Sequence, residues 1–412
     1  MCRMLMWMAV TGGVVGTVVA DWPQFQGPQR SGVIAGAQIA RSWPADGPKV
    51  LWTRDLGPGF ASPAVKDGKV YILDRPDNHR DVLRCLDLAT GKEEWTVAYD
   101  APGKLSYNGS RSTPSVCERY VFVVGPFGHF HCIDRATHQS VWTKHLIDDF
   151  DGKRPNWGVA QSPLLHGDSV IVMPLGREVG VAAFDKASGK PLWQSPGIGR
   201  MEYASPVLAT IDGTDQIVAI SHKGSATGVE VGTGKVLWQY HGWRCSIPIP
   251  TPTPVGDGRL FITGGYKAGS VMIQVTRQGD AFGVKELFRL DDCGSIIHNA
   301  LLHKGHLYAN FNTKRTFDGL ACVALDGTVK WKTERSPNYE KGNLIILGDV
   351  ILTLDGRGGD LAMIEASPAG YKELARARVL SAKPIWAPIV YADGKLLVRD
   401  QKQMKCLDVS AK

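Results

Sequence analysis

Several sequence signals of catalysis and of nucleic-acid binding are missing from this chain of 412 residues. It has no P-loop, no dinucleotide-binding glycine fingerprint and no nucleophile elbow, so the enzyme classes that these motifs mark are not indicated. Its 47 basic and 40 acidic residues are scattered, with no run of lysine or arginine. A nucleic-acid partner requires a concentrated basic footprint and is therefore not expected.

Long apolar runs are also missing, apart from one at the N-terminus. There Arg3 is followed by an apolar stretch from Leu5 to Val19 and by the small residues that a signal peptidase reads, ending at Ala20. We predict a cleaved signal peptide over residues 1–20 and one domain over residues 21–412, exported to the periplasm or beyond the cell. The alternative is a single membrane anchor, for which the run is short. No transmembrane segment is expected in the mature chain.

The cysteines show no disulfide framework. Four of the eight recur at comparable places in a repeat and are predicted to be small buried hydrophobes: Cys85, Cys132, Cys322 and Cys406. Three others have no such place, and a bridge among them stays open: Cys117, Cys245 and Cys293.

What the sequence does contain is a repeated motif, a small-residue turn followed by a polar or Lys residue and then Trp. Its copies are Thr90–Trp95, Thr137–Trp142, Ser188–Trp193, Thr233–Trp238 and Leu325–Trp331. The first four tryptophans lie 47, 51 and 45 residues apart. A period of about 40–50 residues with strand and turn content is typical of β-propeller blades.

Eight apolar hairpins lie between the copies of this Trp motif. Most of them turn at Asp-Gly, Gly-Asp or Lys-Gly, and the glycine supplies the positive φ of a two-residue hairpin turn. The last hairpin lacks an outer strand, whereas Pro48–Thr53 closely matches the outer strand at Gly234–Gln239. We therefore predict an all-β, eight-bladed propeller of four-stranded antiparallel blades, in which the N-terminal strand completes the last blade.

Most residues of the repeat are expected to serve packing. The tryptophans should dock neighbouring blades: Trp52, Trp95, Trp142, Trp193, Trp238 and Trp331. The aspartates before the turns should cap them: Asp87, Asp134, Asp185, Asp326 and Asp408. None of these residues is predicted to carry catalysis.

This combination of motifs resembles the quinoprotein-like (PQQ-like) propeller repeat, and its length and plan are similar to the BamB-like propeller proteins of outer-membrane assembly. The resemblance implies the fold and two kinds of role. Members act either as partner-binding scaffolds or as oxidoreductases that hold pyrroloquinoline quinone (PQQ) and Ca²⁺ at the channel mouth, often beneath a disulfide between adjacent cysteines. This sequence has no adjacent cysteine pair.

Geometry indicates where a site would lie. Residues just before each inner strand should line the channel mouth, and there they are unusually aromatic and charged: Phe60, Arg111, Trp157, Gln161, Glu202, Tyr203, Arg244, His298, Asn299, Tyr339, Lys341 and Trp386. Such a mouth suits a planar or anionic small ligand. Arg111, Arg244 and Trp157 are the preferred candidates, because guanidinium and indole groups hold carboxylates and flat rings.

We expect an exported, monomeric, non-catalytic propeller that binds an envelope protein or cell-surface component through this mouth or its loop face, with no cofactor. The alternative is a PQQ- and Ca²⁺-dependent oxidoreductase of the quinoprotein alcohol dehydrogenase type. A polysaccharide-processing enzyme that uses Glu202 and His298 as acid and base is a third hypothesis. No metal site is favoured, either at His298, His303 and His306 or at Asp148–Gly152.

Overall fold

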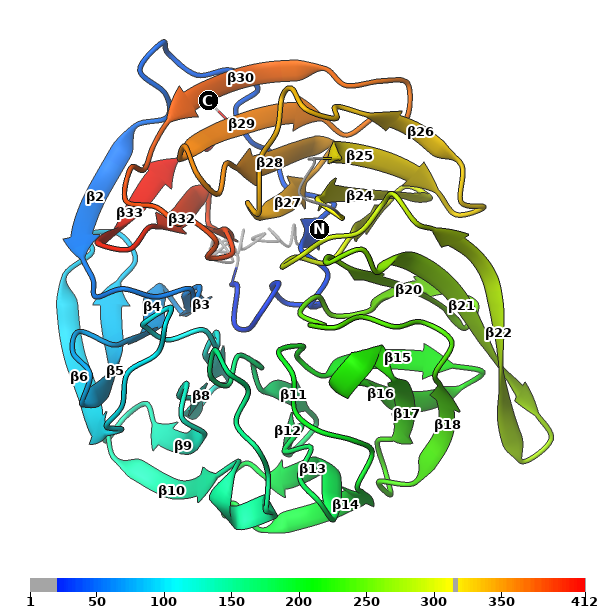
Figure 1. Ribbon diagram of the computed structural model, residues 1–412. Helices are drawn as coiled ribbons and strands as arrows, with labels where there is room; N and C mark the ends of the chain where they lie inside the picture. The colour runs from blue at the N-terminus through cyan, green and yellow to red at the C-terminus, as the bar shows by residue number, and fades with distance from the viewer. Residues whose placement is uncertain (1–20, 314–317, 412) are drawn as a thin grey trace, which may run out of the picture.

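The structure is a computed structural model that describes residues 21–313 and 318–411; the predicted signal peptide over residues 1–20 lies outside the described residues. Eight antiparallel sheets stand around a central axis as the blades of a propeller (Figure 1). This confirms the predicted fold class. No helix in the described part of the chain combines the length and the apolar character needed to cross a membrane.

The first seven blades place their strands in chain order from the axis to the rim, and the blades are numbered here by their inner hairpins. Blade 1 holds β3 (Ala64–Lys66), β4 (Lys69–Asp74), β5 (Arg80–Asp87) and β6 (Glu93–Asp100). Blade 2 holds β7 (Ser115–Val116), β8 (Tyr120–Val124), β9 (His129–Asp134) and β10 (Ser140–His145), followed by the short 3₁₀ helix η1 (Asp148–Phe150). Blade 3 holds β11 (Leu164–His166), β12 (Ser169–Val172), β13 (Val179–Asp185) and β14 (Pro191–Pro196). Blade 4 holds β15 (Val207–Ile211), β16 (Thr214–Ile220), β17 (Ala226–Glu230) and β18 (Val236–Tyr240), with η2 (His222–Gly224) inside it.

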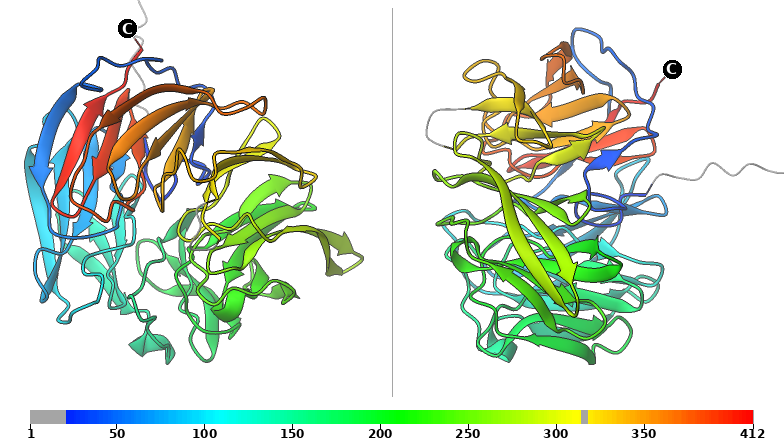
Figure 2. Two further views of the ribbon diagram at one scale, coloured as in Figure 1. Left: turned by 45° about the horizontal axis from the view of Figure 1, so that its top comes forward. Right: turned by 90° about the vertical axis from the view of Figure 1, so that its right-hand side faces the viewer.

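The second half of the ring repeats the plan. Blade 5 holds β19 (Thr253–Gly256), β20 (Arg259–Gly264), β21 (Gly269–Gln278) and β22 (Ala281–Leu290). Blade 6 holds β23 (Leu301–His303), β24 (His306–Phe311), β25 (Gly319–Ala324) and β26 (Val329–Lys332). Blade 7 holds β27 (Leu344–Leu347), β28 (Val350–Leu354), β29 (Asp360–Glu365) and β30 (Glu373–Arg378). The long β21–β22 hairpin extends beyond the rim in Figure 1 and in the left-hand view of Figure 2.

The last blade is closed by the two ends of the chain. It holds β31 (Val390–Ala392), β32 (Lys395–Arg399) and β33 (Gln403–Asp408), and its fourth strand is β2 (Val50–Asp55). The register pairs Val50 with Leu407 and Trp52 with Cys406. The predicted closure is therefore confirmed, and the N-terminal strand gives the last blade the same four strands as the others.

The hairpin turns adopt the backbone that their sequence predicts. Asp67 and Gly68 both have positive φ, 52° and 71°, and Asp393 and Gly394 repeat this with 48° and 72°. Positive φ at both central residues matches the right-handed twist of the two flanking strands. The turn chemistry thus fixes the register of the inner hairpins.

At three junctions the repeated Trp packs on the glycine turn of the next blade, at Trp52, Trp142 and Trp193, whereas Trp238 packs on Gly228 and bonds Gln216 of its own blade. A Cβ added to Gly91 of blade 1 would lie 2.5 Å from the ring of Trp52 of blade 8, and one added to Gly189 would lie 2.6 Å from the ring of Trp142. Where the Trp is replaced, at Phe288 of blade 5, the benzyl ring takes the same place over Gly327. The glycine of the motif is required because the neighbouring ring fills the space of a side chain.

One copy of the motif replaces the glycine with His138. Its φ of 59° keeps the left-handed turn, and its imidazole stacks on Trp95 with a centroid distance of 4.5 Å. Three of the indoles also donate hydrogen bonds to main-chain oxygens of the next blade, from Trp52 to Leu88, from Trp142 to Lys186 and from Trp331 to Ser367.

The aspartates of the repeat cap their turns. Asp87 accepts hydrogen bonds from the N–H and hydroxyl of Thr90, and Asp185 does the same with Ser188. Hydrogen bonds lower the pKa of Asp134 to about 2, and the bond from the N–H of Thr137 has the largest effect. These carboxylates are held by local turns and do not converge on a reaction centre.

The seven cysteines of the described residues are free thiols. Cys85, Cys132, Cys322 and Cys406 are almost completely buried inside their blades, as small apolar residues should be. Cys245 and Cys293 are buried and Cys117 is partly exposed, and no bridge joins them.

The first described residues fill the centre of the ring, which the sequence did not indicate. Trp22 bridges to Val65 of blade 1 and is 1% exposed. The chain then crosses the middle of the ring (Figure 1) and pairs as β1 (Val33–Ile34), in parallel, with the inner strand β27 of blade 7. Residues 21–34 are called the N-terminal plug below. The plug therefore lies across the channel.

Arg30 fixes the plug to the blades around it. Its guanidinium donates hydrogen bonds to the main-chain oxygens of Pro163, at 2.9 Å, and of Pro206, at 3.1 Å, which precede the inner strands of blades 3 and 4. On the opposite side the amide of Gln26 bonds that of Asn299, before the inner strand of blade 6. The plug is therefore held from several sides of the channel.

Candidate binding pocket at the channel mouth

A cavity of about 210 Å³ opens at one end of the channel and is called the mouth pocket here. Seven aromatic side chains line it: Phe25, Phe60, Tyr107, Trp157, Tyr203, Tyr266 and Trp386. The remaining lining residues are Arg111, Ala160, Ser162, Ser205, Ile249, Thr251, Ile296, Ile297, His298, Asn299, Lys341 and Pro388. Most of these residues come from the segments that lead into the inner strands, and Phe25 comes from the N-terminal plug.

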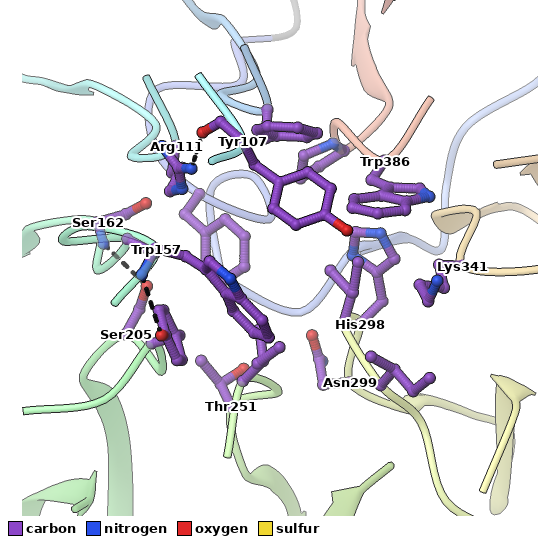
Figure 3. Close-up of a pocket in the computed structure, with 18 of the residues that line it drawn as sticks. Tyr107, Arg111, Trp157, Ser162, Ser205, Thr251, His298, Asn299, Lys341 and Trp386 are labelled. Carbon is purple, nitrogen blue, oxygen red and sulfur yellow. Dashed lines mark hydrogen bonds between the residues drawn. The ribbon is translucent and has the colours of Figure 1, made fainter. Parts of the chain in front are cut away.

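The rings form a continuous aromatic wall. Phe60 stacks on Trp386 with a centroid distance of 5.6 Å and an interplanar angle of 26°. Tyr107 meets Trp386 at 5.6 Å and the edge of Trp157 at 6.1 Å, and Trp157 meets Tyr203 at 5.4 Å. Figure 3 shows the rings of Tyr107, Trp157 and Trp386 facing the same space. Such a wall offers π-faces and ring edges to a flat or aromatic group.

Two cations stand at the edge of this wall. The guanidinium of Arg111 lies 5.5 Å from the centroid of Phe60, and the ammonium of Lys341 lies 4.6 Å from that of Trp386. Lys341 is paired with Glu340 at 2.8 Å, and Glu340 also accepts a hydrogen bond from the Trp386 indole. Glu340 thus orients both groups from behind the wall, without lining the pocket.

Arg111 has no acidic partner among the described residues. It donates to the main-chain oxygens of Gly109, at 2.5 Å, and of Tyr107. Burial lowers the pKa of Arg111 to about 10, so the group keeps its positive charge at neutral pH. A partly desolvated guanidinium without a carboxylate favours an anionic ligand group.

His298 and Asn299 form the polar part of the wall. Burial is the main cause that lowers the pKa of His298 to about 4, so its imidazole is neutral at physiological pH. Its Nδ1 lies 3.2 Å from the amide nitrogen of Asn343. This geometry makes Nδ1 an acceptor, and His298 is held as a neutral ring and not as a third cation.

Tyr107 and Tyr266 are two lining residues that the sequence analysis missed, and both are unusually exposed for aromatic side chains, at 43% and 41%. Tyr266 also has a φ of 57°, which is uncommon for a bulky residue. Backbone strain of this kind collects at binding loops. The sequence signal that could have found Tyr266 is its position beside the tight Gly264-Gly265 pair.

The structure brings together most of the predicted mouth residues, namely Phe60, Arg111, Trp157, Tyr203, His298, Asn299, Lys341 and Trp386. It places the others elsewhere. Gln161 is buried and bonds the main chain of Met173 with both ends of its amide. Arg244 is exposed outside the pocket, and Tyr339 packs between blades against Arg376 and Tyr371.

Glu202 lines a neighbouring hollow and not the mouth pocket. Its carboxylate lies 2.5 Å from Nδ1 of His222, and burial raises its pKa. His298 lies in the mouth pocket, so the structure does not place these two groups around one cavity as an acid and base would require.

No group of three or more His, Cys, Asp or Glu within residues 21–313 and 318–411 is arranged to hold a metal ion. His303 bonds Asp349 at 3.0 Å, on the hairpin turn away from His298. The Asp148–Gly152 segment begins with η1 (Asp148–Phe150), and Asp149 accepts a hydrogen bond from the N–H of His145.

Comparison with known proteins decides the family. A family model described as outer membrane protein assembly factor BamB matches residues 79–310, which is more than half of the chain. The chain belongs to this family. It is a PQQ-like β-propeller, as the repeat predicted.

The proteins that this chain is similar to include alcohol dehydrogenases as well as BamB. A 1-butanol dehydrogenase (cytochrome c) from Thauera butanivorans is 26% identical over 245 residues, which cover 55% of this chain and 34% of that protein. The match thus spans about a third of the length of that curated relative.

Among solved structures, BamB from Moraxella catarrhalis is 14% identical, with a TM-score of 0.62 over 87% of this chain and 99% of that one. The quinohemoprotein alcohol dehydrogenase from Comamonas testosteroni is 13% identical, with a TM-score of 0.63 over 95% and 81%. At these identities the likeness shows the fold alone.

The lining of the mouth pocket fits the quinone of a PQQ–Ca²⁺ site but not its metal ion. The stacked rings of Phe60 and Trp386, with Arg111 and Lys341 at their edge, suit a flat anionic molecule. No Asp or Glu lines the pocket, whereas Ca²⁺ takes oxygen ligands and usually needs carboxylates. The residues therefore fit a planar anion and do not fit the metal.

Proposed function

We propose that this protein is an exported, non-catalytic binding propeller of the cell envelope, which holds a partner protein at its channel mouth. The observation that carries the proposal is the mouth pocket itself, with seven aromatic rings, two cations and no carboxylate. Aromatic and Arg side chains dominate the energetics of protein interfaces, and their presence at a rim without a carboxylate favours binding over chemistry.

The shape of the pocket supports the same proposal. The N-terminal plug lies across the channel, is held there by Arg30 and contributes Phe25 to the pocket lining. Tyr107 and Tyr266 present exposed rings at that mouth. Exposed aromatic side chains on positioned loops are typical of interaction sites.

The alternative is a quinoprotein-type oxidoreductase with a reduced site. The stacked pair of Phe60 and Trp386 favours it, as does the sequence likeness to the 1-butanol dehydrogenase. In that case Arg111, Trp157 and Trp386 would hold the planar anion, while Arg244, outside the pocket, would not contribute. The missing carboxylates speak against a Ca²⁺-assisted reaction at this position.

Two measurements test the proposal. A photo-crosslinking residue at Tyr107 should capture one envelope protein, and the same residue at Leu192, which is 55% exposed on the rim strand β14, should not capture it. Purified protein supplied with PQQ and Ca²⁺ should show no dye-linked alcohol oxidation. Saturable, micromolar quinone binding with alcohol oxidation, both lost in Arg111→Ala, would establish the oxidoreductase instead.

A further inference from the structure

A second hollow of about 270 Å³ adjoins the mouth pocket and is called the basic cleft here. It is lined by Lys153, Arg154, Pro155, Asn156, Trp157, Arg200, Met201, Glu202, Tyr203, His222, Ser246 and Ile247. Trp157 and Tyr203 line both hollows. One wall of two aromatic rings therefore separates an aromatic pocket from a basic one.

The basic cleft is lined by Lys153, Arg154 and Arg200 but by one carboxylate, so most of its positive charge is not balanced by the residues that line it. Its single carboxylate, Glu202, is engaged by His222 at 2.5 Å. Lys153, Arg154 and Arg200 form no ion pair among the described residues. The cleft thus offers three cations to an external anion.

Arg154 shows most directly that an acceptor is missing. Its guanidinium lies 5.2 Å from the ring centroid of Phe127, which holds it in place. Its Nη1 is buried and has no hydrogen-bond partner within the described chain. A buried donor without an acceptor costs free energy. Arg154 as a whole is half-buried and lines the cleft, where its charge favours a ligand carboxylate.

Arg111 extends the same charge into the mouth pocket. Burial is the main cause of its lowered pKa, and the positive charges of Arg154 and Arg75 add to it. Because Arg75 is neutralised by Asp81 at 2.8 Å, the uncompensated pair is Arg111 and Arg154. Two unpaired guanidinium groups, one in each hollow, therefore flank the rings of Trp157 and Tyr203.

We propose that the mouth pocket and the basic cleft form one docking surface for an acidic segment of the partner protein. One aromatic side chain of that segment enters the mouth pocket, and carboxylates next to it pair with Arg154 and Arg200. The mouth pocket, at about 210 Å³, lies below the usual range of about 300–1,000 Å³ for small-molecule sites and suits a single ring system. Charge complementarity selects the acidic segment. This inference rests on the proposed binding function and specifies its partner.

Calorimetric titration with synthetic peptides tests the specificity. The probe is a peptide with one Trp flanked by Asp and Glu, compared with a peptide in which Asn and Gln replace the acids and with one in which Ala replaces Trp. The acidic aromatic peptide should bind at least tenfold more tightly than either control, and added salt should weaken its binding.

Substitutions locate the contact. Arg154→Gln and Arg200→Gln should each weaken binding of the acidic peptide about threefold, and together about tenfold. The matched control is Arg54→Gln with Lys190→Gln, two exposed cations on β2 and in the turn before β14, outside both hollows, and it should leave the affinity unchanged.

Three results would overturn the inference: equal affinity for the acidic and neutral peptides, equal losses in the control pair, or tighter binding to anionic phospholipid vesicles that displaces the peptide. If Tyr107 still crosslinks an envelope protein while the acidic peptide has no advantage, the binding function stands and the proposed partner chemistry is wrong. If Tyr107 crosslinks no protein and quinone restores alcohol oxidation, the binding function itself is wrong.

Discussion

Replacing Arg30 with Met tests whether the N-terminal plug is structural. Arg30 donates hydrogen bonds to the main-chain oxygens of Pro163 and Pro206. After Arg30→Met, Pro163 keeps a donor, the hydroxyl of Ser115 at 2.6 Å. Pro206 loses the only donor that the described residues give it. An unsatisfied buried carbonyl costs about 1–3 kcal/mol, and the loss of a charged hydrogen bond costs about 1.5–3 kcal/mol.

These costs are partly offset, because burial lowers the pKa of Arg30 and the variant no longer has to desolvate a cation. We expect a net loss of about 2–3 kcal/mol in the free energy of unfolding, measured by urea denaturation. Arg41→Met is the control, since Arg41 is exposed in the same N-terminal stretch; it should cost less than about 0.5 kcal/mol. Equal effects of the two substitutions would refute the anchoring role of Arg30.

Three further predictions concern the blades. Gly189→Ala should lower the free energy of unfolding by about 2–4 kcal/mol, because its Cβ would lie 2.6 Å from an indole ring and the backbone there is left-handed, with φ of 67°. Gly232 has open space around it, so Gly232→Ala should cost little in the same urea titration. Trp52→Phe should cost about 2 kcal/mol, since the buried oxygen of Leu88 loses its indole donor at 2.9 Å, and an unchanged denaturation midpoint would contradict this. Burial, opposed by its arginine partner, raises the pKa of Asp81 to about 6, so between about pH 4 and 6 the folded state binds a proton that the unfolded state has lost. The free energy of unfolding of the wild type should therefore fall as the pH rises from about 4 to 6, relative to that of Asp81→Asn. Parallel pH profiles of the two proteins would contradict the assignment.

The ring could be predicted from the sequence because its determinants are local. Each turn glycine, each capping aspartate and each Trp lies within one repeat, and the same short pattern recurs around the chain. Even the irregular copies kept their role, as Phe288 and His138 show. The closure by β2 was predictable because Pro48–Thr53 matches an outer strand that occurs elsewhere in the sequence.

The N-terminal plug could not be predicted because its contacts are remote and unpatterned. Arg30 bonds main-chain oxygens of two loops more than 130 residues away, and any residue can supply such an oxygen. The short parallel strand β1 has only two residues, Val33 and Ile34, and gives no period to detect. Such elements are found through their tertiary contacts alone.

Only part of the lining of the mouth pocket could be predicted, because the orientation of a side chain also depends on tertiary contacts. The rule that residues before an inner strand face the channel holds for Trp157, Tyr203 and Trp386. It says nothing about how a side chain turns, so Gln161, which bonds its own blade, and Glu202, which turns to the basic cleft, did not follow it. Loop residues that lie earlier in the connection, such as Tyr107, were not considered by the rule.

The first part of the described chain contributes both to the ring and to the mouth pocket. The plug carries Phe25 into the floor of the mouth pocket, and the same N-terminal stretch continues into β2, which closes blade 8 against the C-terminal β33. The same stretch of chain therefore lines the pocket and completes the ring. Because the blades dock through repeated ring-on-turn contacts, the loops of the mouth need not hold the ring together. They are free to present exposed rings and unpaired cations, which a stable fold would otherwise avoid.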